Sequence, residues 1–303
     1  MRFLALGEVM IELSSAGEDL WRQRLAGDTF NTAFYLAALR PDWRVGYATR
    51  LGQDAMSDQA LAEIAAAGLR TDRITRDPER GIGLYMIALK KDGERSFAYW
   101  RGQSAARLMA DDPDWLRETC GGADTLYLSG ITLAILAPDA RARLLSALRG
   151  RHVIFDPNIR PQLWESAEAA CQAITAAAGL SRIVLPSFDD EAAAFGDADP
   201  QATAARYAAV GAAEIVVKNG NGPLVLRSNG QSLELPAPVP VRPVDTTGAG
   251  DSFNAGYLAA RLDGADPIRA VAAGQRLAAL VVQHPGALLP RPVLDAFLLE
   301  NAA

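Results

Sequence analysis

The sequence feature that most limits the fold is a regular alternation of short apolar runs with longer helical patterns. Buried strands are predicted at 3–6, 125–128, 153–155, 183–185 and 215–217. Between them, Ala- and Leu-rich stretches such as 139–148 and 168–178 have the spacing of amphipathic helices. Strands joined by crossover helices form a doubly wound, mostly parallel α/β sheet, in which ligands bind at the carboxyl ends of the strands.

Two of the predicted strand ends carry polar residues suited to binding. The strand that ends at Phe155 runs into Asp-Pro-Asn-Ile-Arg at 156–160, and the one that ends at Val217 runs into Lys-Asn-Gly-Asn-Gly at 218–222. Because the carboxyl ends of parallel strands meet at one edge of a sheet, we expect both segments at the ligand-binding edge.

One region breaks the alternation. Segments 83–89 and 95–101 read as strands, and the Asp-Gly pair in the short polar loop between them is a strong hairpin signal. Since side chains alternate across a strand, Tyr99 and Arg101 share one face and Trp100 points to the other. With residues 10–24, this hairpin is predicted to form a small β-sheet lid inserted in a single domain of residues 1–303.

Composition excludes several classes of partner. The chain has 303 residues with 30 Lys+Arg against 36 Asp+Glu, a net charge of -6, which argues against binding nucleic acid or an anionic membrane surface. No apolar run is long enough to cross a bilayer, and Glu8 interrupts any signal-peptide core. Cys120 and Cys171 are too few for a disulfide framework. We expect a cytoplasmic protein.

The most informative segment, 244–257, reads Val-Asp-Thr-Thr-Gly-Ala-Gly-Asp-Ser-Phe-Asn-Ala-Gly-Tyr. A glycine-rich turn that leads into a helix leaves backbone N–H groups free to bind an anion. Asp251, at the predicted helix start, can accept a proton from a substrate hydroxyl while these N–H groups stabilise charge on a transferring phosphoryl group. The alternative is that Asp251 only caps the helix.

This string resembles the C-terminal signature of the PfkB, or ribokinase-like, carbohydrate kinases. Residues 26–33, Ala-Gly-Asp-Thr-Phe-Asn-Thr-Ala, resemble the glycine-rich segment that lines the sugar site in that family. Ala26 stands where many members have a first glycine, and little loss is expected unless that position needs a positive φ. The resemblance implies a ribokinase-like fold, with a doubly wound, mostly parallel sheet flanked by helices and a small β-sheet lid.

Further segments resemble one branch of the family, the 2-keto-3-deoxygluconate kinases. They are 7–13, 83–85, 93–101, 126–136 and 155–164. This resemblance implies ATP-dependent phosphorylation of 2-keto-3-deoxygluconate at its terminal (C6) hydroxyl, giving 2-keto-3-deoxy-6-phosphogluconate and ADP. Two alternatives stay open: another sugar kinase of the fructokinase or ribokinase type, and a non-catalytic protein that senses a sugar or a nucleotide.

The resemblance also implies a set of site residues. Asp251 would be the catalytic base, with an anion hole at Gly248, Ala249 and Gly250. The sugar would be bound by Gly27, Asn31, Tyr85, Tyr99, Arg101, Arg160 and Asp251. ATP would be bound by Asn158, Ser187, Lys218, Gly220, Gly222, Gly248 and Gly250. An acid sugar needs cationic donors, which Arg101 and Arg160 would supply; the alternative is that each arginine is a surface charge or part of a structural ion pair.

The metal predictions are less specific. Mg²⁺ should bridge phosphate oxygens, mostly through water. Where many members have an Asn-x-x-Glu motif to organise that metal, this chain has Ser187 and Asp190, followed by Glu191, so the choice between the two carboxylates stays open. Asp245 and Thr247 match positions that bind a monovalent cation, such as K⁺, in some relatives.

The predicted hairpin also bears on assembly. Trp100, on the face away from Tyr99, would leave apolar surface exposed if the lid stood alone. We therefore expect a homodimer, or a higher homo-oligomer, formed through the lids.

Overall fold

The computed structural model describes residues 1–17, 20–89 and 95–301, and their main feature is a nine-stranded sheet. The strand order is β13-β12-β11-β10-β9-β8-β1-β4-β5. In chain order the strands are β1 (Arg2–Leu6), β4 (Arg44–Gly52), β5 (Arg70–Asp77), β8 (Thr125–Ser129), β9 (Val153–Asp156), β10 (Ile183–Val184), β11 (Glu214–Val217), β12 (Leu224–Ser228) and β13 (Gln231–Leu235). All strand pairs from β11 to β5 are parallel, whereas β12 and β13 add an antiparallel edge. The five predicted strands are confirmed.

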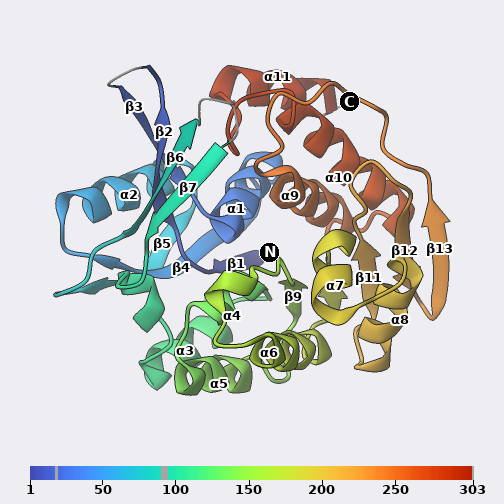
Figure 1. Cartoon of the computed structure of the whole chain (residues 1–303), viewed down its shortest axis with the longest axis horizontal. Coiled ribbons are helices and arrows are strands. Elements are labelled where there is room, and N and C mark those ends of the chain that lie inside the picture. The colour runs from blue at the N-terminus through green and yellow to red at the C-terminus, as the bar shows by residue number, and fades with distance from the viewer. Residues whose placement is uncertain (18–19, 90–94, 302–303) are drawn as a thin grey trace.

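Helices cover both faces of this sheet (Figure 1). One face carries α1 (Asp28–Leu39), α2 (Ala55–Ala66), α9 (Ala249–Arg261) and α10 (Pro267–Val281), with α11 (Arg291–Asn301) packed outside α1 and α10. The other carries α3 (Pro113–Gly121), α4 (Gly130–Ala134), α5 (Pro138–Ala147), α6 (Ala167–Gly179), α7 (Phe188–Phe195) and α8 (Pro200–Ala209). Strand alternation divides the core accordingly: in β1, Phe3 and Ala5 face the first layer, and Leu4 and Leu6 the second.

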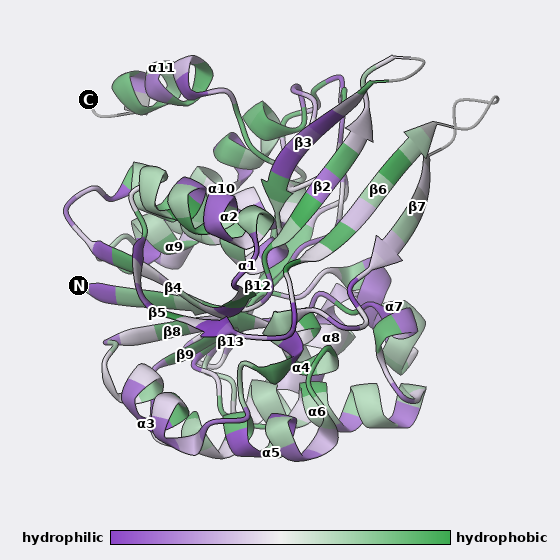
Figure 2. Cartoon of the chain, turned by 90° about the vertical axis from the view of Figure 1, so that its left-hand side faces the viewer, coloured by the Kyte–Doolittle hydropathy of each residue, from purple (hydrophilic) through white to green (hydrophobic). Residues whose placement is uncertain are grey.

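A second, four-stranded sheet projects from the large one (Figure 2). Its order is β3-β2-β6-β7, built from β2 (Met10–Ser15), β3 (Trp21–Ala26), β6 (Gly83–Leu89) and β7 (Arg95–Trp100). The predicted hairpin and its pairing with the early segment are confirmed, while the loop at 90–94 lies outside the described residues. That the chain is a single domain with this sheet as its lid stays a prediction.

The two cysteines lie in helices, and a proline-rich connector lies between β13 and α9. Cys120 is buried, Cys171 is half-buried, and both are free thiols. Residues 236–243 form no helix or strand, and this connector leads from β13 toward α9. No helix among the described residues has both the length and the apolar character needed to span a membrane.

Candidate active site

The two glycine-rich motifs meet where α1 and α9 begin. The two helices pack against each other. Asn31 Nδ2 donates a hydrogen bond of 2.8 Å to Asp251 Oδ2, and Thr32 Oγ1 donates one of 3.2 Å to the Asp251 carbonyl oxygen. The predicted base and the predicted floor of the sugar site are therefore in direct contact, although they are 220 residues apart in the sequence.

The start of α9 has the geometry of an anion site. Gly248 precedes the helix with φ 77°, and a Cβ there would lie 2.9 Å from Ala287, so both conformation and space require glycine. A helix that begins at Ala249 supplies no acceptor for the N–H groups of Gly250 and Asp251. These groups and the positive end of the helix dipole favour a bound anion, as the sequence predicts.

The start of α1 also depends on a close backbone approach. A Cβ on Gly27 would lie 2.4 Å from the carbonyl oxygen of Glu8, which only glycine tolerates. Ala26, by contrast, is the last residue of β3 and does not have a positive φ. The condition under which alanine would be costly at position 26, a positive φ, is therefore not met.

Acidic neighbours change the chemistry of Asp251. Burial, reinforced by the charges of Asp28 and Asp156, raises the pKa of Asp251 to about 7, while Asn31 and Lys218 act in the opposite direction. Burial likewise raises the pKa of Asp28, whose carboxylate accepts a hydrogen bond of 2.7 Å from Asn158 Nδ2. A carboxylate with a pKa near neutrality is a better proton acceptor than an ordinary aspartate, because it binds the proton more tightly once it has received it.

A buried polar network lies beside Asp251 that the sequence does not predict as a unit. Lys218 Nζ is 3.4 Å from Asp156 Oδ2 and 3.0 Å from Asn254 Oδ1. Asn254 Nδ2 in turn donates to Asp156 Oδ2 at 2.6 Å and to the Tyr127 hydroxyl at 3.1 Å. One sequence signal could have indicated this network: Asp156 lies in segment 156–160 and Asn254 in segment 244–257, both of which are predicted to bind ligands.

The small sheet and the residue that follows it supply three of the predicted sugar-binding residues, Tyr85, Tyr99 and Arg101. Tyr85 and Tyr99 are cross-strand neighbours with stacked rings whose centroids are 5.7 Å apart. The Tyr85 hydroxyl donates to the carboxylate of Glu12, and the guanidinium of Arg101 forms an ion pair with Glu8. Both carboxylates are almost fully buried, and neither was predicted to belong to the site.

Arg160 and the two candidate carboxylates for Mg²⁺, Asp190 and Glu191, lie around the start of α7. Arg160 Nη1 is 3.0 Å from Asp190 Oδ2, so Arg160, like Arg101, has an ion pair within the chain. Glu191 is fully buried and accepts hydrogen bonds from Arg206 and Tyr207 of α8; burial raises its pKa to about 7. Of the two, Asp190 is the more exposed, at 29% of its side chain.

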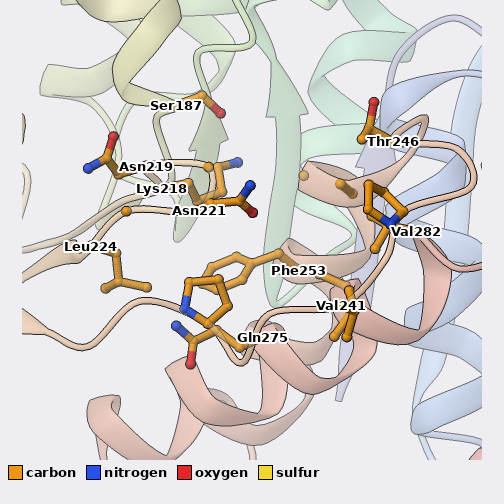
Figure 3. A pocket seen from close by; sticks show the side chains of 18 of the residues that line it. Ser187, Lys218, Asn219, Asn221, Leu224, Val241, Thr246, Phe253, Gln275 and Val282 are labelled. Atoms are coloured by element: carbon orange, nitrogen blue, oxygen red, sulfur yellow. The ribbon is translucent and has the colours of Figure 1, made fainter.

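A cavity of about 360 Å³ opens beside the start of α9 (Figure 3). Its polar wall contains five of the predicted ATP-binding residues: Ser187, Lys218, Gly220, Gly222 and Gly250. Its apolar wall is made by Leu224, Val239, Val241, Phe253, Ala278 and Val282. Two of these, Val239 and Val241, come from the proline-rich connector, which was not predicted to reach the site. Asn158 is not part of the lining and bonds to Asp28 instead.

The residues that matched a monovalent-cation site are engaged with each other. Asp245 accepts hydrogen bonds from the Thr247 N–H and hydroxyl at 3.0 and 2.7 Å, and from the Gly286 N–H at 2.9 Å. These contacts fix the turn that leads to Gly248. In the part of the chain that the structure describes, no cluster of three or more His, Cys, Asp or Glu side chains could hold a metal ion.

The fold and this site together define a class of protein, the carbohydrate kinases with a ribokinase-like fold. The family model for "pfkB family carbohydrate kinase" matches residues 2–294, and the chain belongs to that family. It is 41% identical to a 2-dehydro-3-deoxygluconokinase of Dickeya dadantii (96% of this chain and 97% of that protein are covered), and 39% identical to one of Escherichia coli K12 (97% and 99%). A crystal structure of a PfkB protein from Polaromonas sp. JS666 is similar with a TM-score of 0.83 and 31% identity, covering 97% of this chain and 99% of that one.

Proposed function

We propose that this protein transfers the γ-phosphoryl group of ATP to the C6 hydroxyl of 2-keto-3-deoxygluconate. The observation that supports the proposal most is the contact between Asp251 and Asn31. It joins a carboxylate of raised pKa, at a helix start that favours an anion, to the segment proposed to bind the sugar. The relatives named 2-dehydro-3-deoxygluconokinase, similar over nearly their full length, support the choice of sugar.

Asp251 is the proposed base. As the sugar hydroxyl oxygen forms a bond to the γ-phosphorus, the bond from that phosphorus to the bridging oxygen of ADP breaks, and the hydroxyl proton passes to an Oδ of Asp251. The N–H groups of Gly250 and Asp251 stabilise the charge on the phosphoryl oxygens, helped by the turn through Gly248 and Ala249. Asn31 holds the carboxylate in position with its 2.8 Å hydrogen bond.

The small sheet and the strand ends would recognise the sugar. Arg101 and Arg160 are the proposed donors to its carboxylate, since an ionised donor and acceptor make the strongest hydrogen bonds. Tyr85 and Tyr99 would contact the carbon chain from the lid, and Gly27 would contribute the floor. The ion pair with Glu8 would orient Arg101, and the hydrogen bond to Glu12 would orient Tyr85.

ATP would occupy the cavity beside α9. Its base suits the apolar wall of Val239, Val241 and Phe253, and its phosphates suit the helix start at 248–251.

Two metal ions belong to the proposal. Mg²⁺, when bound, neutralises phosphate charge; it needs few protein ligands, and Asp190 is the proposed carboxylate near it. K⁺ near Asp245 and Thr247 is a further proposal, supported by the way Asp245 ties together the turn before Gly248 and the backbone at Gly286.

The direct test is a coupled ATP-turnover assay over a panel of sugars. We expect the highest kcat/KM with 2-keto-3-deoxygluconate, and much lower values with fructose, ribose and aldonic acids. A preference for fructose or ribose would contradict the sugar assignment, and no turnover with any sugar would favour the sensing alternative.

The same assay in potassium chloride and in tetramethylammonium chloride tests the K⁺ proposal. Equal rates in the two salts would contradict it.

We also propose that the protein is a cytoplasmic homodimer joined through the small sheets. Trp21 and Trp100 lie on the sheet face opposite Tyr85 and are 44% and 59% exposed. Aromatic surface of this kind is typical of an interface. Light scattering at micromolar concentration is expected to give the mass of a dimer, and Trp100→Glu is expected to lower it toward that of one chain. A monomeric mass for the unaltered protein would contradict the interface.

A further inference from the structure

Lys218 is one of three lysines in a chain whose other 27 basic residues are arginines. Of the 30 basic residues, three are lysines, at positions 90, 91 and 218, and Lys218 is the only lysine among the residues that the structure describes. The two cations are not equivalent: an ammonium is a compact point charge, whereas a guanidinium is a broad planar fork. A lysine in such a chain indicates a place where a compact charge is needed.

The position of Lys218 Nζ is fixed by two buried partners. It is 3.0 Å from Asn254 Oδ1 and 3.4 Å from Asp156 Oδ2, and its side chain is 11% exposed. Asn254 and Asp156 are also bonded to each other at 2.6 Å, so the three groups form a closed triangle. An ammonium has three N–H donors, and this triangle occupies two of them.

The ammonium also lies next to the helix start that would receive the phosphoryl group. A Cβ on Gly250 would be 3.7 Å from Lys218 Nζ, and both residues line the cavity proposed for ATP. Figure 3 shows Lys218 in the wall of this cavity. Gly250 contributes one of the two N–H groups that the helix leaves free. The third donor of Lys218 can therefore reach an anion held at this helix start.

The local charge explains why a cation is needed here. Asp28, Asp156 and Asp251 lie close enough together to affect one another's charge. Three carboxylates would repel an incoming triphosphate, and two backbone N–H groups offset that repulsion only in part. Arg101 and Arg160, which are paired with Glu8 and Asp190, are the cations proposed for the sugar carboxylate and not for the phosphate.

We propose that the ammonium of Lys218, held by Asp156 and Asn254, donates to a γ-phosphoryl oxygen of ATP during transfer and is therefore a catalytic residue. This inference rests on phosphoryl transfer as the proposed function, but not on which sugar accepts the group. The competing explanation is structural: Lys218 would only neutralise the buried carboxylate of Asp156.

The first measurement is the kinetics of Lys218→Met with whichever sugar the unaltered enzyme uses best. Removing one donor to the transferring group is expected to lower kcat by about 10²–10³-fold, with a much smaller change in the KM for ATP.

Two further variants serve as comparisons. The kcat of Lys218→Arg is expected to stay well below that of the unaltered enzyme, because a guanidinium does not fit among Asp156, Asn254 and Gly250. Arg227→Met, which removes a cation of β12 that bonds only to Ser232 in the described contacts, is the charge-matched control and should keep full activity. Retention of near-normal kcat by Lys218→Met would overturn the proposal.

The second measurement separates catalysis from structure by binding alone. ADP with aluminium fluoride mimics the transferring phosphoryl group, so Lys218→Met should lose affinity for that mixture while keeping its affinity for ADP. The double variant D156N/K218M removes Asp156 and Lys218 together, so that neither is left without the other, which protects its fold. Its affinity for ADP with aluminium fluoride, relative to its affinity for ADP, should be as low as that of Lys218→Met. A return of the ratio to its normal value in the double variant would show that Lys218 acts only on Asp156, and would overturn the inference.

Discussion

Asp251→Asn is expected to lower kcat by about 10²–10⁴-fold, the usual contribution of a positioned base. The amide has no proton-accepting carboxylate, but its oxygen can still accept the hydrogen bond from Asn31. Sugar binding and the thermal unfolding midpoint should therefore change little. Steady-state kinetics and calorimetric titration with the sugar check both parts, and turnover close to that of the unaltered enzyme would exclude Asp251 as the base.

The pH dependence of kcat/KM is a second test of Asp251 as the base. Asp251 must be deprotonated to act, and its pKa is raised to about 7, so kcat/KM should rise with pH through that region. The charged groups that act on Asp251 are Asp28 on α1, Asp156 on β9 and Lys218 after β11.

Asp28→Asn removes one of the two charges that raise the pKa of Asp251, so the acidic limb should move to lower pH while activity at high pH is kept. An unchanged limb would mean that a different group titrates.

Strand prediction succeeded where burial leaves a continuous apolar run. The strands β1, β8, β9, β10 and β11 lie inside the sheet, with helices on both faces, and each contains a run of apolar side chains. The edge strand β5, in contrast, reads Arg-Thr-Asp-Arg-Ile-Thr-Arg-Asp and has no such run. Its pairing with β4 could not be predicted, because partial exposure lets polar side chains occupy a strand.

The site was predictable to the extent that its residues lie within one continuous motif. Asp251, Gly248 and Gly250 follow from a single helix start, where local sequence determines the backbone geometry. Glu8 could not be predicted in this way. A buried carboxylate is recognised by its partner, and the partner of Glu8 is Arg101, which is 93 residues away in the sequence. Lys218 was predicted to bind ATP, but its contacts with Asp156 and Asn254 could not be predicted, because those partners come from two other segments of the chain.

Arg101→Ala is expected to remove most of the preference for an acid sugar. A hydrogen bond to a charged group contributes about 1.5–3 kcal/mol, so kcat/KM for 2-keto-3-deoxygluconate should fall by about 10–100-fold. The analogue in which a hydroxymethyl group replaces the carboxylate should be used about equally by the altered and unaltered enzymes. The measured quantity is the ratio of kcat/KM for the two sugars in each enzyme.

The ion pair with Glu8 makes the choice of control important. Arg101 and Glu8 side chains are 9% and 1% exposed, and removing one partner of a buried pair leaves an uncompensated charge that costs about 3–5 kcal/mol of stability. The double variant E8Q/R101A removes both charges and should fold better than Arg101→Ala while showing the same loss of preference. If the double variant instead prefers the acid sugar as strongly as the unaltered enzyme does, Arg101 is a structural partner of Glu8, and the sugar carboxylate is recognised elsewhere, with Arg160 the remaining candidate.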